Sequence, residues 1–399
     1  MHTSVRAQAE PAPLRKVLIC KSVLLQYSET FILEQLHSYA HWDPILVGLR
    51  RLEAGLPLDR AQVLLLYGSK PTLVHNIIRK GLGEVGLSPP GFFRRLRELG
   101  ASLVHTHFAT EAVTFWPIVR RLGCPLVVTL HGSDINIYRE CWHRGELGFG
   151  NRRYPDRLLS LSRSPRVYFV AVSDAIKRRA MEYGIAPERI SVRHTGIDLE
   201  RFHFSGVPVI ARRKRILFVG RFVEKKGGEY LLRAFARLRN AVPDAELTMV
   251  GDGPLLKKFE QLVAELQIPV RFPGALTATE VKKEIDAARV LCLPSVTAAN
   301  GDAEGFGMVL LEAQACGVPV VTSARGGAEE GVIDGKTGFA FAEKDVDALA
   351  ERLTRVLSDD DLALSMSEEA QDFVRRRFDI RRCTRSLERL YDEITGVTQ

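Results

Sequence analysis

VLCLPSVTAANGDAEGFGMVLLEAQACGVPVV, residues 290–321, is typical of a strand, a loop, a helix and a second strand in succession. Val290–Leu293 is a short apolar run that predicts a buried strand. The glycines of Gly305–Gly307 interrupt the chain, and Met308–Cys316 then has apolar residues at helical spacing. Gly317 ends this helix just before the next apolar run begins. The stretch therefore predicts one strand–helix–strand crossover of a parallel sheet.

Short apolar runs alternate with helical patterns through the rest of the chain in the same way. In the first half these runs are Lys16–Cys20, Pro44–Leu49, Val63–Tyr67, Leu103–His107, Leu126–Leu130, Val167–Val172 and Ile190–Arg193. In the second half they are Arg215–Val219, Glu246–Val250, Val270–Phe272, Val290–Leu293, Pro319–Thr322 and Gly338–Phe341. Runs of this length between helices indicate parallel strands that are buried on both faces. Two such series predict an α/β protein of two doubly wound, Rossmann-like domains that face each other across a cleft.

The linker between the two series is expected at Arg201–Lys214, where Gly, Pro and basic residues show no regular periodicity. We accordingly expect an N-terminal domain over residues 1–204 and a C-terminal domain over residues 205–375. Residues 376–399 are charged and amphipathic, and we expect them to form a helix that packs back on the N-terminal domain. Ligands of open α/β sheets bind beyond the carboxyl ends of the strands, so the chemistry should lie in the loops that follow them.

The composition limits the class of protein. Of the 399 residues, 46% are hydrophobic and 26% are charged, as in globular proteins. No apolar run approaches the ~20 residues of a membrane helix, and the N-terminus lacks the apolar core of a secretory signal. The six cysteines lie far apart without a Cys-x-x-Cys pair, which favours reduced core thiols over disulfides or zinc ligands. These features predict a cytoplasmic protein.

The net charge of +8 lies in the first half of the chain. Residues 1–200 hold 27 Lys and Arg against 18 Asp and Glu, or +9, and the remainder hold 29 against 30, or −1. This asymmetry suits a partner with phosphates, either an anionic membrane surface or nucleic acid. We expect no nucleic-acid partner, because neither zinc-finger spacing nor an aromatic–basic RNA-binding signature is present.

Basic residues surround Phe92–Phe93 in the first half, namely Arg79, Lys80, Arg94, Arg95 and Arg97. Basic residues with paired aromatic rings suit the interface of an anionic membrane, at the inner face of the cell membrane. A basic helix of a soluble protein would show the same pattern, so both interpretations stay open.

The start of the helix at Met308 is a candidate phosphate site. The amides of Gly307, Met308 and Val309 lack intrahelical acceptors, and the helix dipole adds positive potential, which suits a diphosphate. Glu312 lies one turn further and can accept the hydroxyl hydrogens of a ribose. Glu304 precedes the helix and can bind sugar hydroxyls. Two glutamates alone would indicate solvated side chains, but the Gly-x-Gly interruption and the apolar helix favour the functional interpretation.

Three further side chains are expected at the same cleft. Arg221 directly follows the strand Arg215–Val219, and its guanidinium can hold a phosphate with two hydrogen bonds. Lys226 adds a positive charge on the next turn, although a basic surface loop would look similar. His131 follows the strand Leu126–Leu130 and should project from the first domain toward the sugar.

Glu304–Glu312, with its Glu-x7-Glu spacing, resembles the signature of family 4 retaining glycosyltransferases, and five other motifs resemble the same family in the same order. They are THFA (106–109), TLHGSD (129–134), HTGIDLERF (194–202), VGRFVEKKG (219–227) and VGDGP (250–254). Six motifs that match one family in the same order are hard to obtain by chance, so the resemblance is specific to this family. The resemblance implies the GT-B fold, in which the N-terminal domain binds the acceptor and the C-terminal domain binds a nucleotide sugar.

The resemblance also implies the reaction. It implies a hexosyltransferase that retains the anomeric configuration and needs neither a metal ion nor a cofactor. The donor would be a UDP- or GDP-linked sugar, and the acceptor a saccharide, lipid-linked if the membrane interpretation holds. Arg221 and Lys226 would contact the donor diphosphate, while Glu304 and His131 would act at the sugar. Asp134 is expected either to fix the loop of His131 or to touch the acceptor.

The first loop departs from the family. Many members carry a Gly-Gly loop after the first strand, whereas Ser22–Ile32, SVLLQYSETFI, has no glycine and resembles the form found in exopolysaccharide and colanic-acid-type members. Two other functions stay open: a nucleotide-sugar epimerase on the same architecture and a dinucleotide oxidoreductase. The oxidoreductase would need a Gly-x-Gly-x-x-Gly after a first strand, and neither Lys16–Cys20 nor Arg215–Val219 has one.

Overall fold

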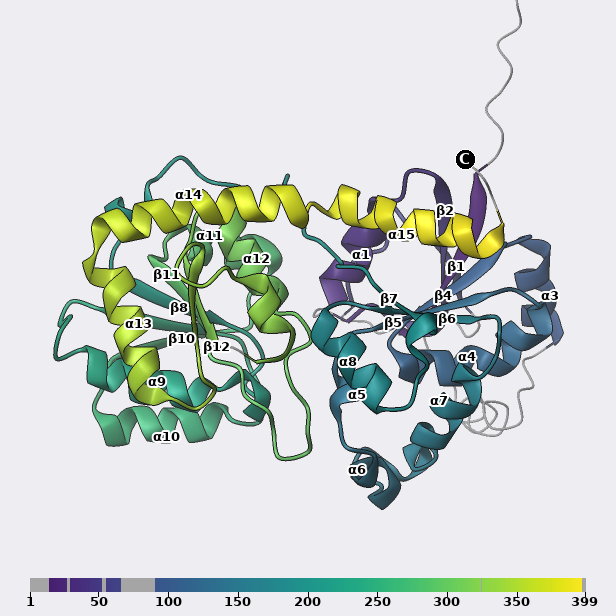
Figure 1. The fold of residues 1–399 in the computed structure, drawn as a ribbon, viewed down its shortest axis with the longest axis horizontal. Coiled ribbons are helices and arrows are strands. Elements are labelled where there is room, and N and C mark those ends of the chain that lie inside the picture. The colour runs from purple at the N-terminus through teal and green to yellow at the C-terminus, as the bar shows by residue number, and fades with distance from the viewer. Residues whose placement is uncertain (1–13, 27–28, 52–54, 66–89, 324, 397–399) are drawn as a thin grey trace, which may run out of the picture.

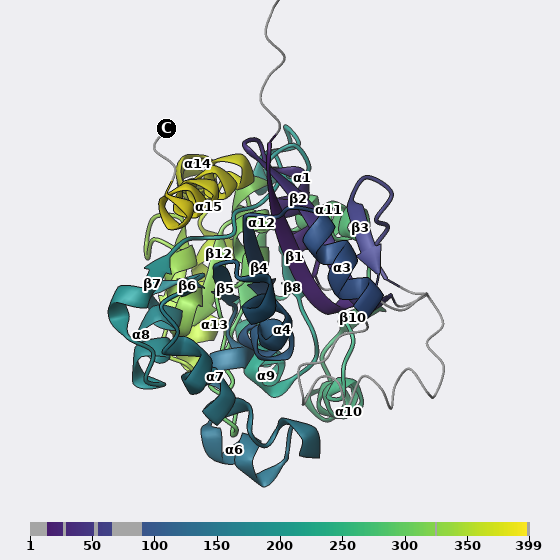
Figure 2. The ribbon, with the colours of Figure 1, turned by 90° about the vertical axis from the view of Figure 1, so that its right-hand side faces the viewer.

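The structure is a computed structural model that describes residues 14–26, 29–51, 55–65, 90–323 and 325–396. The chain forms two α/β domains side by side, with the helices α14 (Asp360–Arg377) and α15 (Ile380–Thr395) running nearly end to end across both of them (Figure 1). The end view in Figure 2 shows the same two helices overlapping along the line of sight. The predicted pair of doubly wound domains is confirmed.

The first domain is built on a seven-stranded parallel sheet in the order β3-β2-β1-β4-β5-β6-β7. Its strands are β1 (Arg15–Leu24), β2 (Trp42–Arg51), β3 (Gln62–Leu65), β4 (Leu103–His107), β5 (Leu126–Leu130), β6 (Val167–Ala171) and β7 (Ile190–Val192). Its helices are α1 (Thr30–His37), α3 (Pro90–Glu98), α4 (Ala109–Leu122), α5 (Ser133–Asn136), α6 (Arg139–Arg144), α7 (Tyr154–Ser162) and α8 (Asp174–Glu182). Every residue of β4 and β5 is buried, as expected for parallel strands that are covered on both faces.

The second domain repeats this design with a six-stranded parallel sheet in the order β10-β9-β8-β11-β12-β13. Its strands are β8 (Arg215–Val219), β9 (Glu246–Val250), β10 (Val270–Gly274), β11 (Val290–Leu293), β12 (Val320–Ser323) and β13 (Gly338–Phe341). Its helices are α9 (Gly228–Leu238), α10 (Leu256–Leu266), α11 (Ala278–Asp286), α12 (Met308–Ala315), α13 (Val346–Ser358) and α14. The strand–helix–strand unit expected from residues 290–321 is therefore β11–α12–β12, at the middle of this sheet.

The first two strands extend beyond the runs that the sequence indicates. β1 and β2 pair in register from Arg15 opposite Trp42 to Leu24 opposite Arg51. The apolar run of β1 was expected to end at Cys20, because Lys21 and Ser22 are polar. Lys21 is nevertheless buried, and its charge is compensated inside the domain, so the strand continues through it.

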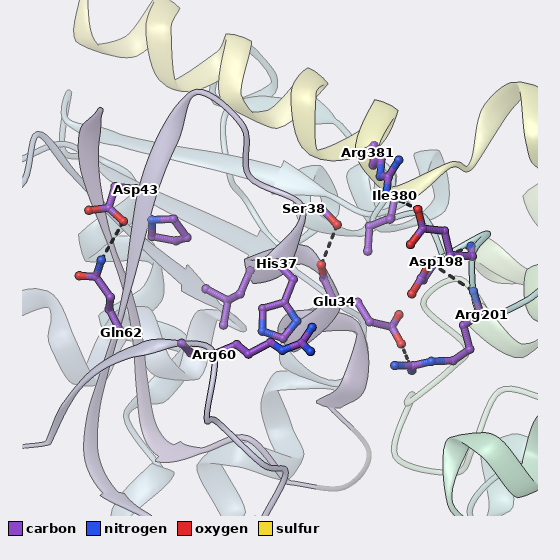
Figure 3. A pocket seen from close by; sticks show the side chains of 14 residues that line it. Glu34, His37, Ser38, Asp43, Arg60, Gln62, Asp198, Arg201, Ile380 and Arg381 are labelled. Atoms are coloured by element: carbon purple, nitrogen blue, oxygen red, sulfur yellow. Dashed lines mark hydrogen bonds and ion pairs between the residues drawn. The ribbon is translucent and has the colours of Figure 1, made fainter. Parts of the chain in front are cut away.

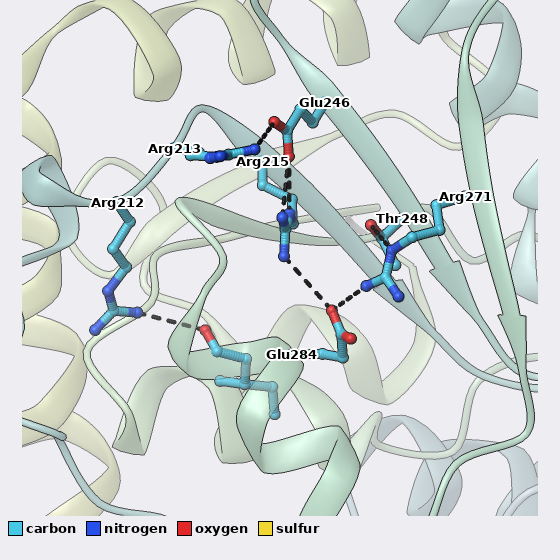
Figure 4. Close-up of polar contacts among 8 residues, drawn as sticks. Arg212, Arg213, Arg215, Glu246, Thr248, Arg271 and Glu284 are labelled. Carbon is cyan, nitrogen blue, oxygen red and sulfur yellow. Dashed lines mark hydrogen bonds and ion pairs between the residues drawn. The ribbon is translucent and has the colours of Figure 1, made fainter.

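The basic residues at the end of the linker and the start of β8, Arg212, Arg213 and Arg215, all bind groups of the second domain (Figure 4). The buried guanidinium of Arg212 donates to the carbonyl oxygens of Ala288 and Cys316 at 3.2 and 3.3 Å. Arg213 and Arg215 both bind the carboxylate of Glu246 at 3.0 Å. These side chains anchor the end of the linker and the start of β8 within the second domain.

The chain crosses between the domains twice, and the two crossings touch. The amide of Ile197 donates to Phe378 O at 2.8 Å, and the amide of Ile380 donates to Ile197 O at 3.0 Å. Gly196 has φ +77°, and a Cβ at this position would lie 2.8 Å from the Cα of Ile380. The two crossings therefore form a single paired hinge.

Helix α15 packs against the first domain through buried polar groups. The Glu388 carboxylate accepts hydrogen bonds from the amides of Ala40, His41 and Trp42 at 2.9, 2.7 and 3.0 Å. The buried hydroxyl of Tyr391 lies 2.6 Å from His105 Nδ1. We propose on these contacts the division expected from the sequence, with domains over residues 1–204 and 205–375 and with residues 376–399 returning to the first domain.

The basic helix α3 differs from its expected form. Phe92 is only 4% exposed and belongs to the core, and the ring of Phe93 is covered by the guanidinium of Arg121 at 4.3 Å. Phe92 is therefore buried and Phe93 is half-buried, while the neighbouring arginines of α3 are exposed. Arg79 and Lys80 lie outside the described residues. Over the described part of the chain, no helix has the length and apolar character needed to cross a membrane.

Replacing Glu388 with Ala should destabilise the first domain by about 2–3 kcal/mol, because three amides, of which that of Trp42 is buried, lose a charged acceptor. Urea denaturation followed by tryptophan fluorescence measures this, since Trp42, Trp116 and Trp142 all lie in the first domain. The exposed Glu393 on the same helix supplies the control, and Glu393→Ala should leave the midpoint unchanged. Equal midpoints for the two variants would contradict the clamping role of Glu388.

Candidate active site

Glu304 lies on the loop between β11 and α12 and is held in place by charge. Its carboxylate is 2.5 Å from Lys226 Nζ, which comes from the turn after β8, and 3.4 Å from Ser295 Oγ. Burial opposes ionisation of this carboxyl, but the ammonium groups of Lys226 and Lys225 hold the pKa of Glu304 below its usual value. Glu304 is therefore an ionised acceptor with a fixed orientation.

Helix α12 begins directly after this loop. Its N-cap is Gly307, which has φ +81°, and no side chain caps the helix. The first-turn amides of Met308 and Val309 have no acceptor within the helix. The structure thus brings together two expected features, an ionised Glu304 and an uncapped helix start, within four residues of chain.

Glu312 is partly buried and lies next to a second carboxylate that the sequence did not indicate. Burial first, and then the charge of Glu34, raises the pKa of Glu312 to about 8. Glu34 belongs to α1 of the first domain and forms an ion pair with Arg201 at the hinge (Figure 3). Burial also raises the pKa of Glu34, to about 7. The charges of these two carboxyl groups, which belong to opposite domains, therefore interact.

A helical spacing could have indicated Glu34. Phe31 and Glu34 are three residues apart on α1, so they share a face of the helix. Phe31 packs on His131 with ring centroids 4.9 Å apart, so this face of α1 lies beside the loop of His131. Arg201 lies at the boundary of the expected linker, and nothing in its sequence context indicated a partner on α1.

Arg221 follows the end of β8 after one residue, Gly220, and its side chain is exposed. No hydrogen bond or ion pair joins its guanidinium to another described residue. Lys225, on the next turn, is instead paired with Asp302 at 3.0 Å. Arg221 is thus a free cation near a lysine pair whose charges are already balanced.

His131 is positioned by Asp134, which settles one of the two roles expected for that carboxylate. Asp134 accepts hydrogen bonds from the amides of His131 and Gly132 at 3.1 and 2.9 Å and from the amide of Ala109 at 2.9 Å. Asp134 is buried and fully engaged by the backbone, so its role is structural. The loop that carries His131 is therefore rigidly attached to the start of α4.

The imidazole of His131 is neutral. Its Nε2 lies 3.0 Å from His107 Nδ1, and burial, assisted by His105 and Lys21, lowers the pKa of His131 to about 3. His107, whose position at the end of β4 left its orientation open, therefore reaches the cleft side through His131. His105 turns to the core instead, where it binds Thr129 Oγ1 at 2.7 Å.

A buried charged cluster occupies the first loop, where a Gly-Gly turn is absent. Lys21 Nζ lies 2.6 Å from Glu29 and 3.6 Å from Glu111. Glu111 also accepts a hydrogen bond from the amide of Ser22 at 2.8 Å. The ammonium of Lys21 lies 4.8 Å from the ring centre of Phe108, a residue with the unusual φ of +74°. The sequence analysis missed this cluster, because its members are far apart in the chain.

The two domains touch around the Glu304 loop. Ser173 Oγ donates to Gly305 O at 2.9 Å, and the amide of Tyr138 donates to Asn300 O at 2.9 Å. A Cβ at Gly305 would lie 1.9 Å from the carbonyl oxygen of His131. Only a glycine fits this approach, which is the second function of the Gly305–Gly307 segment.

Helix α8 receives capping groups from both domains, and its own N-cap residue, Ser173, accepts a hydrogen bond from the amide of Ile176 at 3.2 Å. Glu330 accepts hydrogen bonds from the amides of Asp174 and Ala175 at 3.0 and 2.9 Å, at the first turn of α8. A carboxylate of the second domain thus binds the helix dipole of the first. Over the described residues, no three His, Cys, Asp or Glu side chains lie close enough together to hold a metal ion.

Two glycosyltransferase family models match most of the chain. Residues 202–373 match the family model described as glycosyl transferases group 1, and residues 51–201 match the model described as glycosyltransferase family 4. A putative colanic acid biosynthesis glycosyltransferase of Salmonella typhimurium is 29% identical over 310 residues, which is 74% of this chain and 71% of that protein.

One further protein is similar to part of the sequence, and one crystal structure is similar to nearly the whole fold. A GDP-mannose-dependent phosphatidylinositol monomannoside mannosyltransferase of Mycolicibacterium smegmatis is 38% identical over 43% of this chain and 48% of its own length, so the match spans about half of that relative. The crystal structure of Anabaena HepE in complex with UDP-glucose has a TM-score of 0.75, 20% identity, and coverage of 95% of this chain and 99% of that one. The likeness to HepE shows the shared fold.

Replacing Gly305 with Ala should hold the domains apart, because the added methyl group would overlap the carbonyl oxygen of His131. We expect a larger radius of gyration in small-angle X-ray scattering and a loss of catalytic rate of about 100-fold or more. Gly150→Ala is the matched control, since a Cβ there meets no atom within 4 Å. An unchanged radius of gyration for Gly305→Ala would contradict this account of the domain contact.

Proposed function

Because the chain belongs to family 4 of the glycosyltransferases, we propose that it transfers a sugar from a nucleotide-sugar donor to a saccharide acceptor in the synthesis of a bacterial cell-surface polysaccharide. The observation that carries this proposal is the ion pair of Lys226 and Glu304 beside the uncapped start of α12, opposite His131. The colanic acid relative supports the polysaccharide assignment. The epimerase and oxidoreductase alternatives are not favoured.

The donor would be a UDP- or GDP-linked hexose, the two classes named for HepE and for the mannosyltransferase relative. Glu312 would accept hydrogen bonds from the ribose hydroxyls, and Glu304 would accept them from the sugar. The diphosphate would lie at the amides of Gly307, Met308 and Val309. The nucleotide would then be held almost entirely by the second domain.

Charge at the leaving group is the main catalytic requirement. Negative charge develops on the diphosphate as the glycosidic bond breaks, and fixed cations and amide dipoles stabilise it in a dry site. Arg221 supplies a free guanidinium, and Lys226 would lie between the diphosphate and Glu304. With these groups, we propose transfer without a metal ion and with retention of configuration. His131, being neutral, would hydrogen-bond the sugar without adding a charge.

The acceptor would bind on the first domain, and we propose a lipid-linked saccharide at the inner face of the membrane. The support is electrostatic: Arg94, Arg95 and Arg97 are exposed on α3, and the first half of the chain carries the excess positive charge. Because Phe92 is buried, the contact would be made by arginines rather than by inserted rings.

Arg221→Ala should lower the turnover number by about 100-fold, because one stabilising group for the leaving diphosphate is lost. The assay measures release of nucleoside diphosphate from UDP- and GDP-sugars in the presence of EDTA. The product configuration is read from its anomeric proton coupling by NMR. Arg233→Ala, which removes an exposed arginine of α9, is the control and should keep full activity.

The same assay can contradict sugar transfer, retention of configuration, metal independence and the role of Arg221 separately. Sugar interconversion without release of nucleoside diphosphate would indicate an epimerase. An inverted product would overturn retention, and activity that EDTA abolishes and Mg²⁺ restores would overturn metal independence. Full activity of Arg221→Ala would remove Arg221 from the site.

Affinity for UDP or GDP should rise with pH between pH 7 and about 8 and level off above it. The ribose hydroxyls donate to an ionised Glu312, so the complex lowers the carboxyl pKa from its free value of about 8. A proton is therefore released on binding below that pH, and affinity increases by at most about tenfold per pH unit. Isothermal titration over pH 7–9, above the phosphate pKa of about 6, measures the effect.

Glu312→Gln should remove this pH dependence and weaken binding. Glu34→Gln should move the rise to lower pH, because Glu34 contributes to the raised pKa of Glu312. Glu369→Gln changes an exposed glutamate of α14 and should behave as wild type. A pH profile that persists in Glu312→Gln would show that another group titrates.

A further inference from the structure

A pocket of about 350 Å³ lies in the seam between the domains and extends to Glu304. The first domain lines it with residues of α8 and of the segment between α5 and α6, including Tyr138 and Arg178. The second domain lines it with the segments around Gly301 and Glu329. The volume lies within the range of about 300–1,000 Å³ that is usual for small-molecule sites.

The pocket exists because the domains are joined around it. Asn136 Nδ2 donates to Ala303 O at 3.2 Å, and the amide of Tyr138 donates to Asn300 O at 2.9 Å. Glu330 caps α8 from the other side of the seam. One wall of the pocket therefore belongs to each domain, and the pocket opens out when the domains separate.

Tyr138 is an exposed aromatic ring in a fixed position. Its side chain is 44% exposed, although the neighbouring backbone is held at Asn300. Gly301 lies against the ring so closely that a Cβ there would be 2.9 Å from two ring carbons. One side of the ring is thus supported by the second domain, and the guanidinium of Arg179 lies over the ring at 5.8 Å from its centroid. The part of the ring that these groups leave exposed remains available. An aromatic ring that is apolar on its face and polar at its hydroxyl suits the mixed surface of a sugar.

Two charged groups in the pocket are free to bind hydroxyls. Arg178 and Glu329 are both exposed, and neither side chain has an ion pair or hydrogen bond with a described residue. Other charges in the pocket are engaged: Arg179 binds Glu182 at 3.1 Å and Asn136 O at 3.1 Å, and Glu304 binds Lys226. The pocket therefore combines one aromatic ring with a few polar groups that can fix the orientation of a small ligand.

We propose that the seam pocket binds a sugar ring of the acceptor, stacked on Tyr138, with Arg178 and Glu329 hydrogen-bonded to its hydroxyls. This inference rests on the proposed transfer reaction and places part of the acceptor site on both domains. Glu304 lines the pocket and also faces the proposed donor sugar, so the two substrates meet at this residue. Acceptor binding and domain closure would consequently support each other, because each requires the same seam.

The test is saturation-transfer NMR on the full chain with UDP present. The probes are the methyl glycosides of glucose, galactose, mannose and N-acetylglucosamine. At least one glycoside should receive saturation from the wild-type protein, and Tyr138→Ala should weaken its binding by about five- to tenfold. Tyr138→Phe, which keeps the ring, should retain binding. Phe149→Ala is the matched control, because Phe149 is 79% exposed in the same domain but lies outside the pocket.

The outcomes separate this inference from the proposed function. If UDP binds and no glycoside does, or if Tyr138→Ala binds as wild type, the seam pocket is not an acceptor site and the transferase proposal stands. Equal losses in Tyr138→Ala and Phe149→Ala would also overturn the assignment. If neither UDP nor GDP binds the wild-type chain, the proposed function fails, and if only GDP binds, the glycoside experiment is run with GDP in place of UDP. Unchanged UDP affinity and melting temperature in Tyr138→Ala show that the variant is folded.

Discussion

The closed arrangement of the two domains depends on the approach of the Gly305 backbone to the carbonyl oxygen of His131. No side chain fits at this position, since a single methyl group would overlap the oxygen. Both partners are fixed before they meet: Asp134 holds the His131 loop, and the ion pair with Lys226 holds Glu304. The contact therefore joins two rigid loops, and the geometry of the candidate site follows from it.

Burial distributes charge unequally across the cleft. On the first domain, it keeps His131 and its partner His107 neutral, and it leaves the carboxyl of Glu34 hard to ionise. On the second domain, Glu304 is ionised beside Lys226, and Arg221 is free. A leaving diphosphate would therefore find its cations on the second domain, while the first domain supplies neutral hydrogen-bonding groups. This division agrees with a donor that is held mainly by the second domain.

Local patterns predicted much of the fold and part of the candidate site. β4, β8 and β11 match their apolar runs residue for residue, because each strand is short and fully determined by its own sequence. The start of α12 was also predictable from its own segment, because the glycines of Gly305–Gly307 directly precede the apolar helical pattern. The pairing of Glu34 with Arg201 and the capping of α8 by Glu330 were not predictable, because each joins polar residues whose own segments could as well face solvent. Such contacts follow from domain packing, which no single segment encodes.

The segment Ser22–Ile32 replaces the Gly-Gly loop that many family members carry after the first strand. A Gly-Gly turn would offer backbone amides to a phosphate, but this chain places Lys21 between Glu29 and Glu111 at the same strand end. Two carboxylates around one ammonium do not attract an anion, so this loop is not suited to hold the diphosphate. The cluster instead fixes the entry to α1, whose Phe31 packs on His131. The first domain thus contributes shape at this edge, in keeping with the proposal that the second domain binds the phosphates.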